Sequence, residues 1–184
     1  DVYNCIIEIP HKDEIDCSVI SVPAAFVRDA ALEAIDSGIK LVVIVSERIP
    51  RRDVVEVLAA ARERGARVVG PNTLGIISPE ESKIGMIGGR VEDVRKSYRK
   101  GCIGVMSRSG GMTTEIANLL TCSGFGQSTC VSVGGDPIVG SDFVDLLPLF
   151  REDVETKAVV LYSEPGGSAD ERLADYVTKN QVKL

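Results

Sequence analysis

One stretch decides the fold that we expect for this chain: Cys102-Ile103-Gly104-Val105-Met106, followed at once by Ser107-Arg108-Ser109-Gly110-Gly111. The apolar run is typical of a buried strand, and a helical pattern follows the serine and glycine turn. Such a turn leaves backbone N–H groups free, and the positive end of the helix dipole lies beside them. The stretch therefore predicts an α/β sheet with an anion site at its edge. The plainer alternative is that Ser109 only caps the helix and the glycines only close the turn.

Two further turns repeat this arrangement. Gly134-Gly135-Asp136-Pro137 follows a strand predicted at 127–133, and Glu164-Pro165-Gly166-Gly167 follows a strand predicted at 158–162. Ligands of open parallel sheets bind at the carboxyl ends of the strands, so we expect the three turns to meet at one site. A carboxylate at a strand end can orient an imidazole or take a proton. The alternatives are a shaped loop without a ligand and, for Glu164, a plain surface acid.

Strands and helices alternate along the whole chain. The pattern predicts strands at 18–22, 41–45, 67–69, 102–106, 127–133 and 158–162, and helices at 26–37, 51–64, 111–123, 142–151 and 169–180. Ser168 and Glu171 have the spacing of a capping box for the last helix. Glycines and prolines interrupt residues 70–90, which predicts two domains, 1–90 and 91–184.

The ends of the sequence carry an expectation of their own. No strand, glycine turn and helix precede the strand at 18–22, and residues 182–184 begin a further strand. A fold does not ordinarily start at its middle or end by opening a strand. We therefore expect a chain that is truncated at both ends.

Composition excludes several classes of function. With 44% apolar residues and a net charge of −6 over 184 residues, the chain is an ordinary globular protein without the clustered Lys and Arg of a nucleic-acid surface. No apolar run approaches the ~20 residues of a membrane span, and no signal peptide pattern begins at Asp1. The cysteines number five, none in a CxxC pair, and there is one histidine. This predicts free thiols in a reducing cytoplasm and no metal site.

A serine hydrolase is also excluded. Ser107, Ser109 and Gly111 loosely fit the nucleophile turn of α/β-hydrolases, in which the catalytic histidine follows the serine. The one histidine, His11, lies far upstream in a polar stretch. We expect it to be a solvated surface residue.

Eight short runs occur in an order and spacing that are specific together, although each is weak alone. They are Val22-Pro23-Ala24-Ala25-Phe26, residues 33–40, Gly70-Pro71-Asn72, Lys83-Ile84-Gly85, Ser107-Arg108-Ser109-Gly110, residues 124–131, Gly134-Gly135-Asp136-Pro137 and Gly166-Gly167-Ser168-Ala169. In these runs the chain resembles the α subunits of succinate–CoA ligase (succinyl-CoA synthetase), in the NDP-forming acyl-CoA synthetase family. The resemblance covers nearly all of the chain.

The resemblance implies an architecture, a reaction and a partner. Residues 1–90 would be part of a CoA-binding Rossmann domain, and residues 91–184 part of a flavodoxin-like parallel-sheet ligase domain. An ATP-grasp β subunit would bind ATP or GTP with Mg²⁺. A phosphoryl group would pass from the nucleotide to a histidine and then to succinate, and CoA would displace it. The location would be the cytoplasm, or the mitochondrial matrix in a eukaryote.

The resemblance also assigns roles to residues. Ser109, Gly110 and Gly111 would hold the phosphoryl group, and Glu164 would orient the phosphohistidine. Thr114 would lie near the acid substrate. The contacts to CoA would come from Pro23, Val45, Ser46, Glu47 and Asn72.

Two departures from the family pattern keep alternatives open. The phosphorylated histidine of the family lies beyond the position of Leu184, so a CoA-binding subunit without its own histidine is one alternative. The family commonly has Ser-Gly-Thr-Leu-Thr-Tyr-Glu where this chain has Ser109-Gly110-Gly111-Met112-Thr113-Thr114-Glu115. The Gly111-Met112 form is similar to ATP-citrate lyase, so the second alternative is a relative that forms citryl-CoA. Pro165, where isoleucine is usual, is a further difference beside Glu164.

Overall fold

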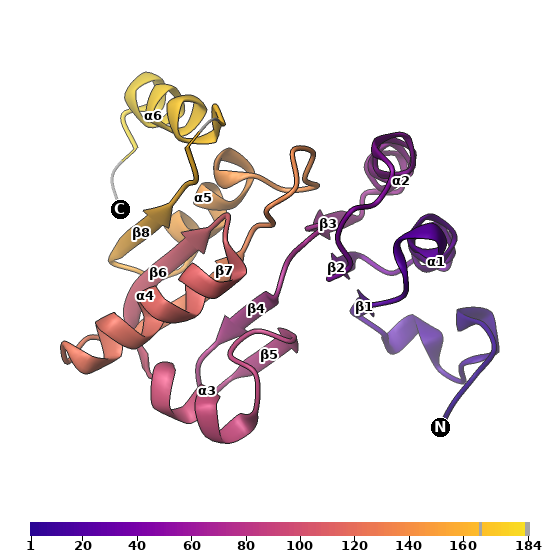
Figure 1. The fold of residues 1–184 in the computed structure, drawn as a ribbon, viewed down its shortest axis with the longest axis horizontal. Helices are drawn as coiled ribbons and strands as arrows, with labels where there is room; N and C mark the ends of the chain where they lie inside the picture. The colour runs from indigo at the N-terminus through magenta and orange to yellow at the C-terminus, as the bar shows by residue number, and fades with distance from the viewer. Residues whose placement is uncertain (166, 183–184) are drawn as a thin grey trace.

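The computed structural model describes residues 1–165 and 167–182, which form two sheets with helices packed against them (Figure 1). The first sheet has the order β1-β2-β3, and all its pairs are parallel. Its strands are β1 (Cys17–Ile20), β2 (Leu41–Ile44) and β3 (Arg67–Val69), joined by α1 (Ala24–Asp36) and α2 (Arg51–Arg64). Two 3₁₀ turns, η1 (Ile6–Glu8) and η2 (Lys12–Glu14), precede them.

The apolar stripes of α1 and α2 create the core of this first unit. Val27, Ala31 and Ile35 recur at helical spacing on α1 and are at most 1% exposed. They pack in one cluster with Val57 of α2 and Val42 of β2. Gly65 ends α2 in the left-handed region at φ +65°, as a helix-terminating glycine does.

The second sheet is mixed and has the order β5-β4-β7-β6-β8. Its strands are β4 (Gly75–Ser78), β5 (Ser82–Gly85), β6 (Lys100–Ser107), β7 (Gln127–Ser132) and β8 (Ala158–Tyr162). Its helices are α3 (Val91–Ser97), α4 (Gly110–Cys122), α5 (Phe143–Glu152) and α6 (Ala169–Asn180). β6, β7 and β8 run parallel, whereas β4 is antiparallel to both β5 and β7.

Alternate residues of the central strands pack in different hydrophobic cores. Val105 of β6 and Cys130 of β7 pack with Ala117 of α4. Their neighbours Met106 and Val131 point to the other face and pack with Phe143 of α5, because side chains alternate along a strand. Val43 and Val69 of the first sheet join this second cluster, so a common core ties the two sheets together.

Most predicted elements are confirmed, and the α/β fold class is correct. Three further elements, β4, β5 and α3, lie outside the predicted pattern. They are short, and glycines and prolines surround them. The β4–β5 hairpin joins the second sheet through β7 and makes that sheet mixed, whereas the predicted strands of residues 91–184 are parallel as expected. The chain changes sheets between Val69 and Gly75; the division into domains at residue 90 stays a prediction.

The capping box predicted at Ser168 and Glu171 is wrong. Ser168 lies at φ −112°, ψ 14° and caps nothing with its side chain. Its hydroxyl instead accepts a hydrogen bond from Arg172 Nη1 at 2.6 Å. A capping box does form at α5, between Asp142 and Asp145. The strand predicted at 182–184 falls largely outside the described residues.

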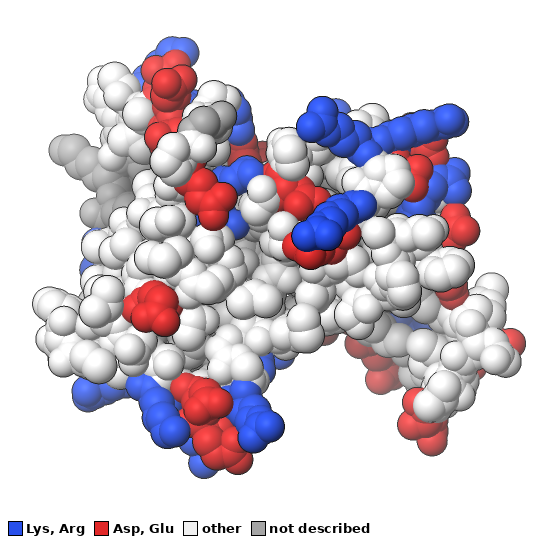
Figure 2. All heavy atoms as spheres, viewed as in Figure 1, with Lys and Arg blue, Asp and Glu red and all other residues white. Residues whose placement is uncertain are grey.

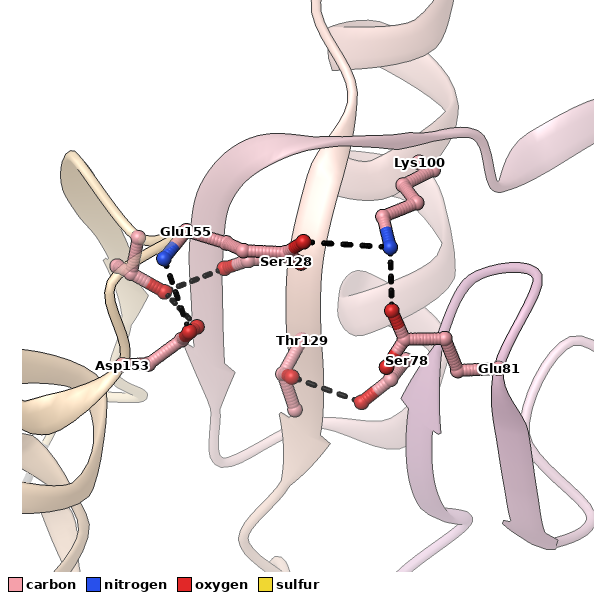
Figure 3. Close-up of polar contacts among 8 residues, drawn as sticks. Ser78, Glu81, Lys100, Ser128, Thr129, Asp153 and Glu155 are labelled. Carbon is pink, nitrogen blue, oxygen red and sulfur yellow. Dashed lines mark hydrogen bonds and ion pairs between the residues drawn. The ribbon is translucent and has the colours of Figure 1, made fainter.

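A polar network occupies the amino ends of the parallel strands (Figure 3). Lys100, at the start of β6, pairs with Glu81 and, at 3.3 Å, with Glu155. Ser128 and Thr156 share a hydrogen bond of 2.6 Å, and Thr156 donates to Asp153 at 2.6 Å. These contacts tie neighbouring loops to one another, so this end of the second sheet has a structural role.

Candidate functional site

The three glycine-containing turns meet at the carboxyl ends of the parallel strands, around a hollow of about 380 Å³. The predicted convergence is therefore confirmed. The hollow is lined by residues of all three turns and of the start of α6: Arg108, Gly135, Pro137, Ser163, Glu164, Pro165, Gly167, Ser168, Ala169 and Arg172. Two cations and one carboxylate line it, which gives it a net positive charge suited to an anion.

The first turn begins α4 with a tight set of hydrogen bonds. Ser109 is the N-cap, and its hydroxyl accepts from Met112 N at the long distance of 3.5 Å. The Ser107 hydroxyl donates to Ser109 O at 2.7 Å and accepts from Ser109 N at 3.1 Å. Thr113 Oγ1 also donates to Ser109 O, at 2.8 Å. The turn is thus held in shape by its own side chains.

The two glycines of this turn have different surroundings. A Cβ atom on Gly110 would lie 2.5 Å from Leu74 Cγ, so Gly110 is needed for close packing. A Cβ atom on Gly111 would meet nothing within 4 Å. Close packing against Leu74 thus explains why residue 110 is glycine. Gly111 instead leaves the backbone at the start of α4 accessible to a ligand.

Arg108 fixes the first turn against the other two. Its backbone N–H donates to Tyr162 O at 3.0 Å, and its Nη2 donates to Asp136 O at 2.7 Å. Arg108 was not among the predicted site residues. The signal was available, because a cation within a glycine and serine turn is what an anion site requires.

Arg172 is the second cation, and α6 supplies it. Its Nη2 donates to Asp142 Oδ2 at 2.9 Å. Burial raises the pKa of the Asp142 carboxyl, but the Arg172 guanidinium and the backbone N–H groups of Asp145 and Val144 outweigh burial and hold it below its usual value. No local signal predicts Arg172, because only the packing of α6 on α5 brings it to the hollow.

The remaining predicted residues of this half lie differently. Glu164 lines the hollow and is exposed. Thr114 does not line it; its hydroxyl shares a hydrogen bond of 2.9 Å with Tyr98, on the side of α4 that faces α3. Burial raises the pKa of Tyr98 to about 12, so its hydroxyl stays protonated. A contact between Thr114 and an acid substrate stays a prediction.

The five residues predicted to bind CoA lie at or beside the carboxyl edge of the first sheet. The Ser46 hydroxyl donates to Val22 O, next to Pro23. Asn72 N donates to Ser46 O at 2.9 Å, and Val45 N donates to Ile20 O at 2.9 Å. Glu47 is exposed and pairs with Arg48 at 3.6 Å. The edge also presents Phe26, of which 62% is exposed, as an apolar surface.

Several other features bear on function. All five cysteines are free. His11 is an exposed residue that pairs with Glu14 at 3.8 Å, as expected for a surface histidine. No group of three His, Cys, Asp or Glu residues comes together within the described ranges 1–165 and 167–182. In that same part of the chain, none of the helices is both long and apolar enough to cross a bilayer.

Two family models match the chain. The CoA binding domain matches residues 1–48, and the CoA-ligase domain matches residues 106–183. Solved structures share the fold of the chain. The chain is 27% identical to ATP citrate lyase from Methanothrix soehngenii, described in complex with citrate and coenzyme A, with a TM-score of 0.84 over 91% of this chain and 28% of that one. PH0766 from Pyrococcus horikoshii is also 27% identical, with a TM-score of 0.76 over 96% and 39%.

Most of the chain therefore matches two domains of CoA ligases, over residues 1–48 and 106–183. Its relatives include succinate–CoA ligase [ADP-forming] subunits alpha. The subunit of Methanothermobacter thermautotrophicus is 46% identical over 96% of this chain, and that of Staphylococcus aureus is 42% identical over 99%. The chain spans 58% of the length of each of these relatives.

Proposed function

We propose that the chain is part of the α subunit of an acid–CoA ligase that makes succinyl-CoA from succinate, CoA and ATP or GTP. The observation that carries this proposal is the cationic hollow of about 380 Å³ between the three turns. The named relatives, at 42–46% identity, favour succinate and ADP formation. Their designation as alpha subunits supports a partner subunit, and we propose an ATP-grasp β subunit that binds the nucleotide with Mg²⁺.

In this proposal the hollow holds the phosphoryl group during transfer. The backbone N–H groups of Gly110 and Gly111 at the start of α4, together with the Ser109 hydroxyl, donate to phosphoryl oxygens. The guanidinium groups of Arg108 and Arg172 balance the charge that moves with the group. These donors are already fixed by the hydrogen bonds of the turn, so little reorganisation accompanies transfer.

Glu164 is proposed to orient a phosphorylated imidazole. A carboxylate that accepts from one ring nitrogen fixes the tautomer and leaves the other nitrogen to carry the phosphoryl group. His11 is not this histidine, because it is exposed and lies in the N-terminal segment before β1. The imidazole would come from outside the 184 residues.

Pro23, Val45, Ser46, Glu47 and Asn72 are proposed to hold CoA at the carboxyl edge of the first sheet. Exposed apolar surface on Phe26 and Val22, next to backbone carbonyls, fits a ligand with both apolar and polar parts. When bound, CoA supplies the thiol that displaces phosphate from the acyl group. The free thiols of the chain fit a reducing compartment such as the cytoplasm.

A citryl-CoA-forming activity is the second candidate. The Gly111-Met112 pair and the similarity to ATP citrate lyase favour it. Assays of CoA-ester formation with succinate and with citrate separate the two candidates. Activity with succinate alone would remove the second.

The principal test is Glu164→Gln in the complete subunit with its partner. We expect ligase turnover to fall about 100-fold or more, since positioned acid–base groups contribute 10²–10⁴-fold. The melting temperature should not change, because Glu164 is exposed. Glu115→Gln is the matched control, as Glu115 is an exposed acid on α4 that does not line the hollow. Unchanged turnover in Glu164→Gln would contradict the proposal.

A further inference from the structure

A continuous path of hydrogen bonds leads from the edge of the first sheet to the hollow. Asn72 N donates to Ser46 O at 2.9 Å. The Asn72 side chain then donates from Nδ2 to Asp136 Oδ1 at 3.0 Å, and the carbonyl of Asp136 accepts from Arg108 Nη2 at 2.7 Å. Asn72, Asp136 and Arg108 are all half-buried, so solvent weakens these contacts less than it would at the surface.

From this path we infer that Asn72 and Asp136 are positioning residues that couple the two half-sites. Occupation of the first-sheet edge changes the affinity of the hollow for an anion, and the reverse, through the side chains of this pair. The inference rests on the proposed function, because it takes CoA as the ligand of the edge and phosphate as the ligand of the hollow.

The charge on Asp136 explains why this pair matters. Its carboxylate belongs to the loop that holds Arg108, and it is kept in place by the Asn72 amide. Without that bond the carboxylate is free to turn to the Arg108 guanidinium and neutralise it. An anion in the hollow would then compete with Asp136 for the same cation.

The side-chain contact can be removed without separating the sheets. Several other hydrogen bonds cross the junction: Gly135 N to Asn72 O at 3.1 Å, Gly140 N to Gly70 O at 2.8 Å, and Ser141 Oγ to Val68 O at 2.8 Å. Asn72 itself has φ +57°, in the left-handed region. Asn72→Gly therefore deletes the amide at a position where glycine has no backbone strain.

The test measures CoA binding by titration calorimetry, with and without inorganic phosphate, on the complete subunit assembled with its partner. In the wild-type protein we expect phosphate to change the Kd for CoA by about fivefold or more, a typical size for coupled sites. In Asn72→Gly the change should be less than about twofold, whatever happens to the Kd itself. Asp136→Ala should also reduce the change to less than about twofold, and it provides the same test if Asn72→Gly does not fold.

Two further variants make the test specific. Asp136→Asn keeps an oxygen that accepts from Asn72 but removes the charge that competes for Arg108, so it should lose the coupling as Asp136→Ala does. Ser78→Ala removes a half-buried side-chain bond to Thr129, 2.8 Å long, that links β4 to β7 but connects no ligand site (Figure 3). It should retain the coupling and control for a general loss of polar contacts.

The outcomes separate the inference from the proposed function. Full coupling in both Asn72→Gly and Asp136→Ala would overturn the inference, and so would a wild-type protein that binds both ligands independently. A wild-type protein that binds neither CoA nor phosphate would overturn the proposed function and the inference with it. Loss of coupling in Ser78→Ala would also count against the assigned pair.

Discussion

The carboxyl edges of the two sheets offer different chemistry although both follow parallel strands. At the first edge, Ser46 and Asn72 bond to backbone carbonyls, and the surface includes the exposed Phe26. At the second edge, Arg108 and Arg172 line a hollow together with Glu164. Strand direction thus determines where a site can form, and the turn residues determine which ligand it suits.

Charged side chains are unevenly spread over the surface. In Figure 2 the surface over α4, on the left of the view, is mostly uncharged apart from an acidic group, whereas Lys, Arg, Asp and Glu gather near α3 at the bottom and in the upper part of the view. The hollow lies where cations are held by hydrogen bonds and not merely exposed. A fixed cation recognises an anion better than a mobile one, because less entropy is lost on binding.

The largest expected effect lies at the junction between the sheets. A Cβ atom on Gly134 would lie 2.3 Å from Pro71 O, and its φ of +118° disfavours any L side chain. Gly134→Ala should lower the free energy of unfolding by about 3 kcal/mol or more. Chemical denaturation measures this value.

Gly124→Ala is the matched control for Gly134→Ala. Gly124 also has a positive φ, +84°, but a Cβ atom there meets nothing within 4 Å. It should destabilise by only about 1 kcal/mol. Equal effects at the two positions would mean that the sheets are not held together at Gly134.

The next effect separates packing from ligand binding within the second edge. Gly110→Ala should destabilise by about 1–2 kcal/mol, because Leu74 must move. Gly111→Ala should be neutral or stabilise by about 0.5 kcal/mol, since glycine is unfavourable in helices. Phosphate affinity should nevertheless fall in Gly111→Ala. Unchanged phosphate binding there would show that the start of α4 is not in contact with the anion.

A smaller effect concerns the carboxylate that holds Arg172. Asp142→Ala removes the cap of α5 and should destabilise by about 1 kcal/mol, whereas Asp142→Asn keeps a capping oxygen and should lose less. The pKa of Asp142 is lowered in the folded protein. The ionised Asp142 carboxylate therefore contributes its full stabilisation at pH values above its unfolded-state pKa of about 3.9. This contribution is lost as the pH falls through the lower pKa of the folded state.

Denaturation of wild type and Asp142→Asn between pH 2 and 7 checks this prediction. The difference in unfolding free energy between the two proteins should shrink at the acid end. A constant difference would mean that the Arg172 contact adds nothing to stability.

The smallest effect compares cysteines of the two sheets and involves no change in stability. Burial raises the pKa of both Cys17, on the outer strand β1, and Cys130, on the central strand β7. Cys130 is fully buried and Cys17 only half-buried. Alkylation followed by mass spectrometry should modify the exposed Cys102 and Cys122 first, then Cys17, and Cys130 only after unfolding. Early modification of Cys130 would contradict the packing of β7.

Prediction from sequence succeeded where the signal is local. The helix at 51–64 was predicted to the residue, because Pro50, an apolar stripe and Gly65 define it without help from other segments. The hairpin of β4 and β5 was missed. Its strands have four residues each; β5 pairs with β4, and β4 in turn pairs with β7, which is about 50 residues away in the sequence.

The same distinction applies to the site. The turn that contains Ser109 and Gly111 could be predicted from local signals, and Ser109 is the N-cap of α4; their contact with an anion stays a prediction. Arg172 could not, because its position depends on how α6 packs. The predicted capping role of Ser168 failed because its ψ of 14° is not the extended geometry of a capping serine, and its hydroxyl accepts from Arg172 instead.

The sequence by itself determined the alternation of strands and helices, the three turns and their place at strand ends, since these follow from side-chain periodicity and from the backbone freedom of glycine. Only the tertiary structure decided which side chains share the hollow, and that Asn72 of one edge reaches Asp136 of the other. Contacts between segments distant in the chain depend on packing, and no local pattern encodes them.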